Sequence, residues 1–342
     1  MSDLFPTRPT DLTSTWLSEA LGFEVSDFTI SYFTEGTSVM GQVTRLYLTS
    51  KNGPASLIAK FATPVSANRG VAEAYDMYGR EIGFYRGINR NVRLRTPQCC
   101  FAGYNPTNHD FLLILEDMVD YTIGDQVAGC TIEEARRVVD MLAAFHASAW
   151  DDQAPDVVSH NNPLQVQGMV GGFQMGWPVV QKEFNHLIPL SARHIGDLMP
   201  AAIPALLQQM CQPPVCLTHA DVRLDNIFFG ATDVSLVDWQ SVCTSAPEHD
   251  LAYFITQSVP QEVRRSEDLL TRYHTGLTGH GIVYDPAVLS KRYRVCALYL
   301  LCYAVVIAGT LDMGNERGRQ LARTLLGNSL SALDELNAFE LL

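Results

Sequence analysis

Residues 217–240 constrain the fold of this chain more than any other stretch. They read Leu-Thr-His-Ala-Asp-Val-Arg-Leu-Asp-Asn-Ile-Phe-Phe-Gly and, after a short break, Val-Ser-Leu-Val-Asp-Trp-Gln. The pattern predicts two apolar strands that carry polar residues at their ends, with a tight polar loop between them. Asp221, Asn226 and Asp238 place oxygen donors in this otherwise β-branched and aromatic context. Hard cations such as Mg²⁺ prefer ligands of that kind, so the stretch predicts a metal-binding loop.

The spacing of these residues matches a template for phosphoryl transfer. A motif His-x-Asp-x-x-x-x-Asn begins at His219, and Asp238 follows one strand later. In the template the first Asp accepts the proton of the substrate hydroxyl, and the Asn and the later Asp hold the metal. An isolated His-x-Asp could instead be a capped turn, and Asp225 could serve only the backbone of its own loop. For His219, a buried imidazole that bonds a backbone carbonyl is an equally good interpretation.

The same residues carry a resemblance to a known family. Residues 219–226 and 237–240 resemble the Brenner-type motif and the metal-binding Asp of the aminoglycoside phosphotransferase/choline kinase family, and the chain is also similar to ecdysteroid kinase-like proteins. These are small-molecule kinases with a protein-kinase-like fold. The resemblance implies ATP and Mg²⁺ as cofactors, Asp221 as the catalytic base, and Asn226 and Asp238 as metal ligands. The family usually has Gly where this chain has Ala220, which leaves the geometry of the loop open.

The expected fold is an α+β structure of two lobes, the bilobal protein-kinase-like fold. A small antiparallel sheet and the nucleotide site are expected in residues 1–116, and a mainly helical, catalytic and substrate-binding lobe in residues 117–342. Three strands are predicted in the first lobe by β-branched and aromatic runs bounded by turn residues, at 24–34, 42–49 and 55–61.

A loop with small residues joins the first two of these strands. It runs from Glu35 to Gly41 and includes Thr37 and Ser38. Backbone N–H groups of such a loop can bind phosphate oxygens, which makes Thr37 and Ser38 candidates for nucleotide binding. Taken alone, the segment is a plain hairpin turn.

Lys60 is a stronger candidate, because a lysine that closes an apolar strand needs an acidic or phosphate partner. In the kinase template this Lys contacts the nucleotide phosphates and pairs with a Glu on the next helix. Helical periodicity predicts that helix over residues 70–89. Glu81 borders the buried face of this helix and is a candidate partner for Lys60. Glu73 is the alternative candidate. The resemblance favours Glu81, since residues 80–85 resemble the Glu-x-x-Phe-Tyr element of the family.

An apolar strand at 111–118 ends in acidic residues and is predicted to connect the lobes. The resemblance assigns the backbone contacts with adenine to Glu116 and Met118. Pockets of this kind are mainly apolar with a few placed polar groups.

Four features stand out in the second lobe. Thr131 caps a predicted helix that runs to about Trp150. Residues 151–190 are rich in Asn, Pro, Gly and Gln and are predicted to be a flexible insertion that carries substrate contacts. Asp250 matches a family Asp, for which helix capping or support of the catalytic loop is expected. The 17 uncharged residues 295–311 are better explained as a buried helix than as a membrane span.

Composition excludes several other functions. The net charge of −13 argues against a nucleic-acid partner. The eight cysteines are scattered, no secretory leader is recognised at the start, and reduced thiols in a cytoplasmic enzyme are expected. Cys211 and Cys216 have no second pair and no His at zinc spacing. No P-loop and no Gly-x-Ser-x-Gly motif occurs in the sequence.

Together these features predict ATP-dependent phosphorylation of a hydroxyl group on a small molecule, without a membrane or nucleic-acid partner. One alternative is a non-catalytic nucleotide-binding module, a pseudokinase. A protein kinase is disfavoured, because the gap between Asp238 and Pro247 is too short to hold a peptide platform. The substrate, the choice between ATP and GTP and the oligomeric state do not follow from the sequence.

Overall fold

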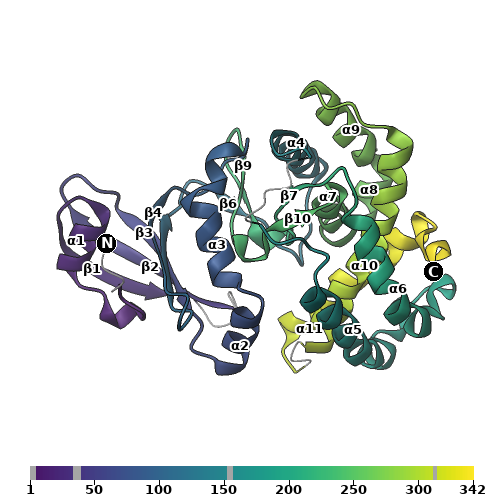
Figure 1. Cartoon of the computed structure of the whole chain (residues 1–342), viewed down its shortest axis with the longest axis horizontal. Coiled ribbons are helices and arrows are strands. Elements are labelled where there is room, and N and C mark those ends of the chain that lie inside the picture. The colour runs from purple at the N-terminus through teal and green to yellow at the C-terminus, as the bar shows by residue number, and fades with distance from the viewer. Residues whose placement is uncertain (1–4, 34–39, 152–156, 311–313) are drawn as a thin grey trace. The chain divides into compact units, whose positions relative to one another are not determined.

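The computed structural model describes residues 5–33, 40–151, 157–310 and 314–342. The chain forms two compact units. Figure 1 shows their helices and strands, coloured by residue number from purple at the N-terminus to yellow at the C-terminus. The first unit comprises Met1–Asn91, Arg95–Tyr121 and Val237–Ser241, and the second comprises Val92–Leu94, Thr122–Leu236 and Val242–Leu342. Residues 237–241, which include Asp238, therefore cluster with the first unit, although the division expected from the sequence places them in the second lobe.

A five-stranded antiparallel sheet forms the centre of the first unit. Its strands are β1 (Val25–Tyr32), β2 (Gly41–Ser50), β3 (Ser56–Ala62), β4 (Cys99–Tyr104) and β5 (Phe111–Glu116). They lie in the order β1-β2-β3-β5-β4, and each neighbouring pair is antiparallel. This sheet, together with the helical second unit, confirms the predicted α+β class with an antiparallel sheet in the first part of the chain and mainly helices in the second.

Strand alternation explains how β3 carries a buried lysine. Leu57, Ala59 and Phe61 alternate along β3 and belong to the apolar core that Leu17 of α1 (Ser14–Leu21) also joins. Successive side chains of a strand point to opposite faces of the sheet, so Lys60 lies on the other face. The alternation that buries Leu57, Ala59 and Phe61 in the core therefore places Lys60 on the opposite face of the sheet.

Two helices, not one, follow β3. α2 spans Ser66–Ala74 and α3 spans Met77–Arg86, whereas a single helix was predicted over 70–89. The chain breaks at Asp76, whose φ of 49° is left-handed, a conformation that Asp tolerates better than most residues. Tyr104 Oη donates to Asp76 Oδ1 at 2.8 Å. Glycine at position 79 accommodates this carboxylate, because a Cβ there would lie 2.4 Å from Asp76 Oδ1.

The second unit is mainly helical. Its helices are α4 (Ile132–Ser148), α5 (Pro163–Glu183), α6 (Ile195–Met210), α7 (Glu248–Tyr253), α8 (Gln261–Ser266), α9 (Leu269–Gly279), α10 (Pro286–Thr310) and α11 (Glu316–Glu335). Its short strands are β6 (Thr122–Ile123), β7 (Cys216–Thr218), β8 (Ile227–Phe229), β9 (Val234–Leu236) and β10 (Cys243–Ser245), which form the sheets β6-β8-β9 and β10-β7. The predicted cap is confirmed, since Thr131 and Glu134 form a capping box at the start of α4.

The segment expected to be a flexible insertion contains the long helix α5, so the prediction of flexibility was wrong. Asn162 caps α5, and Figure 1 shows α5 near α10 within the second unit. The glycines serve close packing here. A Cβ on Gly176 would lie 2.4 Å from the carbonyl oxygen of Val305, and a Cβ on Gly309 would lie 2.5 Å from Gly176 Cα. The two backbones meet where neither residue has a side chain.

Gly176→Ala should therefore destabilise the protein. The new methyl group must displace backbone atoms of α10, and overpacking of this kind costs about 1–3 kcal/mol, which outweighs the gain of roughly 1 kcal/mol in helix propensity. Gly171→Ala is the matched control, because a Cβ there meets no atom within 4 Å. Urea unfolding should give a lower free energy of unfolding for Gly176→Ala than for the wild type, and a higher one for Gly171→Ala. Equal shifts in the same direction would contradict the close approach of α5 and α10.

Helix α10 is long and apolar enough to cross a membrane by length and composition alone. However, 67% of its most apolar 18-residue window is buried inside the protein. Its buried side chains include Leu298, Tyr299 and Val305. This burial agrees with the predicted core helix of the larger unit.

Candidate functional site

Lys60 lies between two carboxylates in the first unit. Its Nζ is 2.7 Å from Glu81 Oε2 of α3 and 2.5 Å from Asp238 Oδ1. Lys60 and Glu81 are buried, with relative exposures of 7% and 1%. The expected pairing of Lys60 with Glu81 is present. Glu73, the competing candidate, pairs instead with Arg69 at 2.8 Å.

The charges of this cluster support one another. Burial disfavours the ammonium form of Lys60, but Asp238 and Glu81 outweigh this effect and raise the pKa of Lys60 above its ordinary value. Lys60 is therefore cationic at neutral pH. Two carboxylates around one buried ammonium leave the cluster one negative charge in excess, which suits a site that also receives a cation.

Residues around Asp238 are held by aromatic packing within the first unit. Trp239 stacks on Phe84 of α3 with ring centroids 3.7 Å apart and an interplanar angle of 6°. Asp238 has a φ of 67°, and Gln240 Nε2 donates to its Oδ2 at 3.2 Å. A left-handed backbone at a carboxylate is strained and needs such support, as is frequent at functional sites.

Asp221 and Asn226 meet within the second unit. Asn226 Nδ2 donates to the carbonyl oxygen of Asp221 at 2.9 Å and to its Oδ2 at 3.0 Å. This orientation directs the amide nitrogen at Asp221 and leaves Asn226 Oδ1 outside these two bonds. That oxygen and the carboxylate of Asp221 are hard donors, so the pair fits a Mg²⁺ ion chemically.

Burial and the negative charge of Asp221 raise the pKa of Tyr253 well above its ordinary value, so this neighbouring phenol remains protonated. The side chain of His219 is fully buried, and the backbone N–H of Asp221 donates to its Nδ1 at 3.2 Å. His219 therefore bonds the backbone of its own loop, here through an N–H group, whereas a backbone carbonyl was expected.

Asp250 holds the loop before Asp221. Its two carboxylate oxygens accept the backbone N–H groups of His219 and Ala220, both at 2.8 Å, and Oδ2 also lies 3.2 Å from His146 Nε2. Burial alone would raise the pKa of Asp250, but the hydrogen bond and charge of His146 outweigh burial and lower it. Of the two roles expected for Asp250, the structure thus assigns support of the loop.

Ala220 adopts a φ of 62°, the left-handed conformation that favours glycine. A non-glycine residue pays about 1–2 kcal/mol for this conformation. The two N–H groups bound to Asp250 hold the backbone there despite the strain. Ala220 therefore keeps a positive φ, the conformation that glycine would adopt easily at this position.

Ala220→Gly should leave stability within about 1 kcal/mol of the wild type, because the released strain offsets the entropy of glycine in the unfolded chain. Ala220→Val should lose roughly 2 kcal/mol or more, since a β-branched side chain fits a positive φ poorly. Thermal unfolding measures both. Ala246→Gly is the control: Ala246 is equally buried and is not among the residues with positive φ, so glycine there should destabilise. A stable Ala220→Val protein would contradict the left-handed assignment.

Gln126 is a loop-positioning residue that sequence reasoning missed. Its fully buried side chain accepts the N–H of Leu224 at 2.9 Å through Oε1 and donates to the carbonyl of Gln257 at 2.7 Å through Nε2. Its own N–H donates to Asp225 Oδ1 at 3.0 Å, so Asp225 does serve backbone near its loop. Nearly a hundred residues separate Gln126 from this loop, and no local pattern marks it.

The remaining predicted nucleotide contacts differ in their surroundings. Thr37 and Ser38 lie outside the described residues. Glu116 is half-exposed, with its carboxylate 2.6 Å from Arg95 Nη2 and bonded to the N–H of Gln98. Met118 is buried, with 6% relative exposure. The side chain of Glu116 is thus engaged with protein, which leaves any contact with adenine to its backbone.

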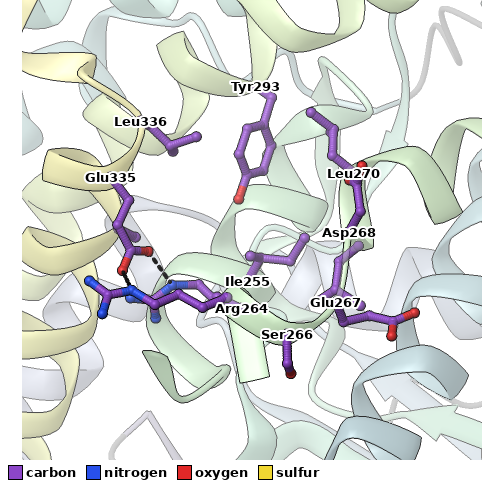
Figure 2. A pocket seen from close by; sticks show the side chains of 12 residues that line it. Ile255, Arg264, Ser266, Glu267, Asp268, Leu270, Tyr293, Glu335 and Leu336 are labelled. Atoms are coloured by element: carbon purple, nitrogen blue, oxygen red, sulfur yellow. Dashed lines mark hydrogen bonds and ion pairs between the residues drawn. The ribbon is translucent and has the colours of Figure 1, made fainter. Parts of the chain in front are cut away.

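A separate surface pocket of about 480 Å³ lies in the second unit. Figure 2 shows Glu335 directed at the guanidinium of Arg264, and Nε of Arg264 is 3.3 Å from Glu335 Oε2. Tyr293 and Leu270 also line it, and none of the predicted site residues does. Both of its arginines, Arg264 and Arg265, pair with Glu335, so we do not assign the chemistry to this pocket.

Comparisons with known proteins agree with this description. The sequence profile of a family described as ecdysteroid kinase-like matches residues 35–281. No curated protein matches the chain significantly. A solved choline kinase from Cryptosporidium parvum Iowa II has a TM-score of 0.58 at 11% identity, covering 93% of this chain and 92% of that one.

Two further solved structures share the fold. A putative aminoglycoside phosphotransferase from Ralstonia eutropha JMP134 has a TM-score of 0.56 at 14% identity, covering 94% of this chain and 97% of that one. The GDP complex of wild-type aminoglycoside 2'-phosphotransferase-IIIa has a TM-score of 0.54 at 15% identity, with coverages of 95% and 97%. At these identities the similarity shows a common fold.

Proposed function

We propose that this chain, which belongs to the ecdysteroid kinase-like family, is an ATP-dependent phosphotransferase that phosphorylates a hydroxyl group of a small molecule. The observation that carries the proposal is the buried cluster of Lys60, Glu81 and Asp238. Buried charges are costly, and a structural core is served as well by apolar residues. A lysine fixed between two acids is what binding of nucleotide phosphates requires, with one acid positioning the lysine and the other holding a metal.

The two units contribute different groups to the proposed reaction. The first unit would supply Lys60, positioned by Glu81, to the nucleotide phosphates, and Glu116 and Met118 to the adenine through their backbone. Thr37 and Ser38 are proposed to contact phosphate through the loop that contains them. The second unit would supply Asp221, and Asn226 and Asp238 would hold Mg²⁺. Bound there, the ion would neutralise charge on the phosphates.

Asp221 carries the proton in this proposal. As the substrate oxygen forms its bond to the γ-phosphorus and the bond to the ADP oxygen breaks, the hydroxyl proton passes to the Asp221 carboxylate. Asn226 Nδ2 holds that carboxylate through Oδ2, and the protonated Tyr253 neighbours it. Positioning and charge neutralisation would supply most of the acceleration.

The class of substrate and the cellular location are also part of the proposal. The solved neighbours are kinases of small molecules, so we propose a small-molecule alcohol as acceptor. We propose a cytoplasmic protein with reduced thiols, because its cysteines form no disulfide among the described residues. No nucleic-acid partner is proposed for a chain of net charge −13.

A second candidate is a non-catalytic nucleotide-binding module. It is favoured by Ala220, whose strained conformation stands where the related kinases usually have glycine. Such a module would bind nucleotide through Lys60 without turning it over. Measurements of binding and of turnover distinguish the two functions.

Nucleotide binding is tested by thermal shift with ATP or ADP, with and without Mg²⁺. At a hundred times the dissociation constant, a ligand that binds only the folded state adds about 2.7 kcal/mol of stability, or roughly 4 °C for a protein of this size. We expect a Mg²⁺-dependent shift that Asp238→Ala abolishes. Asp27→Ala, an exposed carboxylate on β1, is the control and should keep it. The absence of any shift in the wild type would remove both candidate functions.

A further inference from the structure

Three metal-ligating side chains meet inside the second unit, and none belongs to the proposed reaction. They are His160, Cys243 and His249, with relative exposures of 4%, 0% and 0%. One ligand atom from each lies within 4.8 Å of the others. Within the described part of the chain this is the one group of three or more His, Cys, Asp or Glu side chains with such a geometry.

Backbone bonds bring the three segments together. The N–H of His160 donates to the carbonyl of Thr244 at 2.9 Å, and the N–H of Thr244 donates to the carbonyl of Val158 at 3.0 Å. This short parallel bridge fixes His160 beside Cys243, the first residue of β10. His249 lies in the first turn of α7, where its N–H donates to the carbonyl of Ala246 at 3.0 Å.

The distances suit a tetrahedral metal. Cys243 Sγ is 3.5 Å from His160 Nδ1. In a tetrahedral site with Zn–S of about 2.3 Å and Zn–N of about 2.0–2.1 Å, a sulfur and a nitrogen ligand are roughly 3.6 Å apart. The rings of His160 and His249 have centroids 4.5 Å apart at 44°, and a nitrogen of His249 lies within 4.8 Å of the ligand atoms of the other two residues.

Outer contacts orient two of the ligands. His160 Nε2, the nitrogen turned away from the sulfur, is 3.2 Å from the hydroxyl of Tyr299, which Gln165 Nε2 also contacts at 3.0 Å. Thr218 Oγ1 is 3.3 Å from Cys243 Sγ. Metal-bound histidines and thiolates commonly have partners of this type, which set the tautomer and stabilise the sulfur charge.

The hydrogen bonding of His249 also points to a bound ligand. Both of its ring nitrogens are buried and have no hydrogen-bond partner among the described residues. Buried polar groups in native proteins are nearly always satisfied, so an imidazole with neither nitrogen bonded within the described residues points to a water or an ion bound beside it. The nitrogen nearer to Cys243 and His160 is positioned to take that ligand together with them.

We propose that His160, Cys243 and His249 bind one transition-metal ion of the thiolate-preferring class, Zn²⁺ or Cu⁺. Two imidazoles and a thiolate suit both ions, and hard cations such as Mg²⁺ disfavour them. On binding, the metal–sulfur bond forms and the thiol proton leaves to solvent. The ion would link the segment before α5 to β10 and to α7, which carries Asp250. By fixing α7, the ion would stabilise the loop at His219 and Ala220 that Asp250 holds. This role does not depend on whether the chain is a kinase.

The test begins with the full-length protein, purified from cells grown with added Zn²⁺ or Cu²⁺ and dialysed. Elemental analysis should find about one metal per chain, as expected for a single three-ligand site, and its identity distinguishes the two ions. Cys243→Ala and His249→Ala should lose the metal. Cys216→Ala should keep it, because Cys216 is a buried thiol on the neighbouring strand outside the cluster.

A second measurement covers the case in which a variant folds poorly. Chelator-stripped wild type titrated with Co²⁺ should develop a thiolate-to-metal charge-transfer band, and its melting temperature should rise with Zn²⁺. Wild type that carries no metal and shows no such band would overturn the proposal. So would a band of equal strength in Cys243→Ala.

Discussion

Asp221→Asn should abolish nearly all phosphate transfer while leaving nucleotide binding intact. The amide cannot accept the hydroxyl proton, and removal of a general base typically costs about 10²–10⁴-fold in turnover. Asn226 Nδ2 can still donate to the side-chain oxygen of the variant, so the loop should keep its structure. The measurement is ADP release over a panel of small-molecule alcohols, with the nucleotide-induced thermal shift recorded beside it.

Asp225→Asn is the matched control for this experiment. It makes the same substitution in the same loop, and its Oδ1 can still accept the N–H of Gln126. Turnover should stay within about threefold of the wild type, as for a surface change without a role in the transition state. If Asp221→Asn turns over ATP at the wild-type rate, Asp221 is not the base. A wild type that shows the thermal shift and no turnover on any alcohol would favour the non-catalytic module.

Asp250→Ala should destabilise the protein strongly, because this residue of α7 holds the loop that contains Ala220. It would leave the buried N–H groups of His219 and Ala220 without their acceptor and remove the partner of His146 Nε2. Each buried group left unsatisfied costs about 1–3 kcal/mol, so the total for the three groups should reach roughly 3 kcal/mol or more. Release of Ala220 from its left-handed conformation should lower turnover in any protein that remains folded.

The pH dependence of stability separates the charge of Asp250 from its shape. The folded-state pKa of Asp250 is lowered, so its ionised form contributes stability that is complete above the ordinary Asp pKa near 4 and is lost as pH falls through the folded value. Asp250→Asn keeps one oxygen acceptor and lacks the charge. Urea unfolding should show a difference between wild type and Asp250→Asn at pH 7 that shrinks below about pH 4. A constant difference down to pH 2 would show that the charge contributes nothing.

Local patterns in the sequence predicted four of the five strands of the first unit, β1, β2, β3 and β5, and marked Lys60 as a residue that needs an acidic or phosphate partner. Alternation along β3 placed Lys60 opposite the core face, and helical spacing placed Glu81 on the buried side of α3, where the two meet at 2.7 Å. The capping box at Thr131 and the buried helix α10 were likewise readable, because each depends on residues a few positions apart. Such features are set by short-range periodicity and backbone preference.

Contacts between distant segments were decided only by the tertiary structure. Composition predicted a flexible insertion where α5 lies. A glycine such as Gly176 can make a loop flexible or allow close packing against the backbone of α10, and the sequence does not distinguish the two. The sign of φ at Ala220 depends on Asp250, thirty residues later, and Gln126 reaches Leu224 across about a hundred residues. His160, Cys243 and His249 lack any zinc spacing, and the bridge between Ser159 and Thr244 is what brings His160 beside Cys243. A sequence pattern records what each residue can do, whereas folding decides which distant partner it meets.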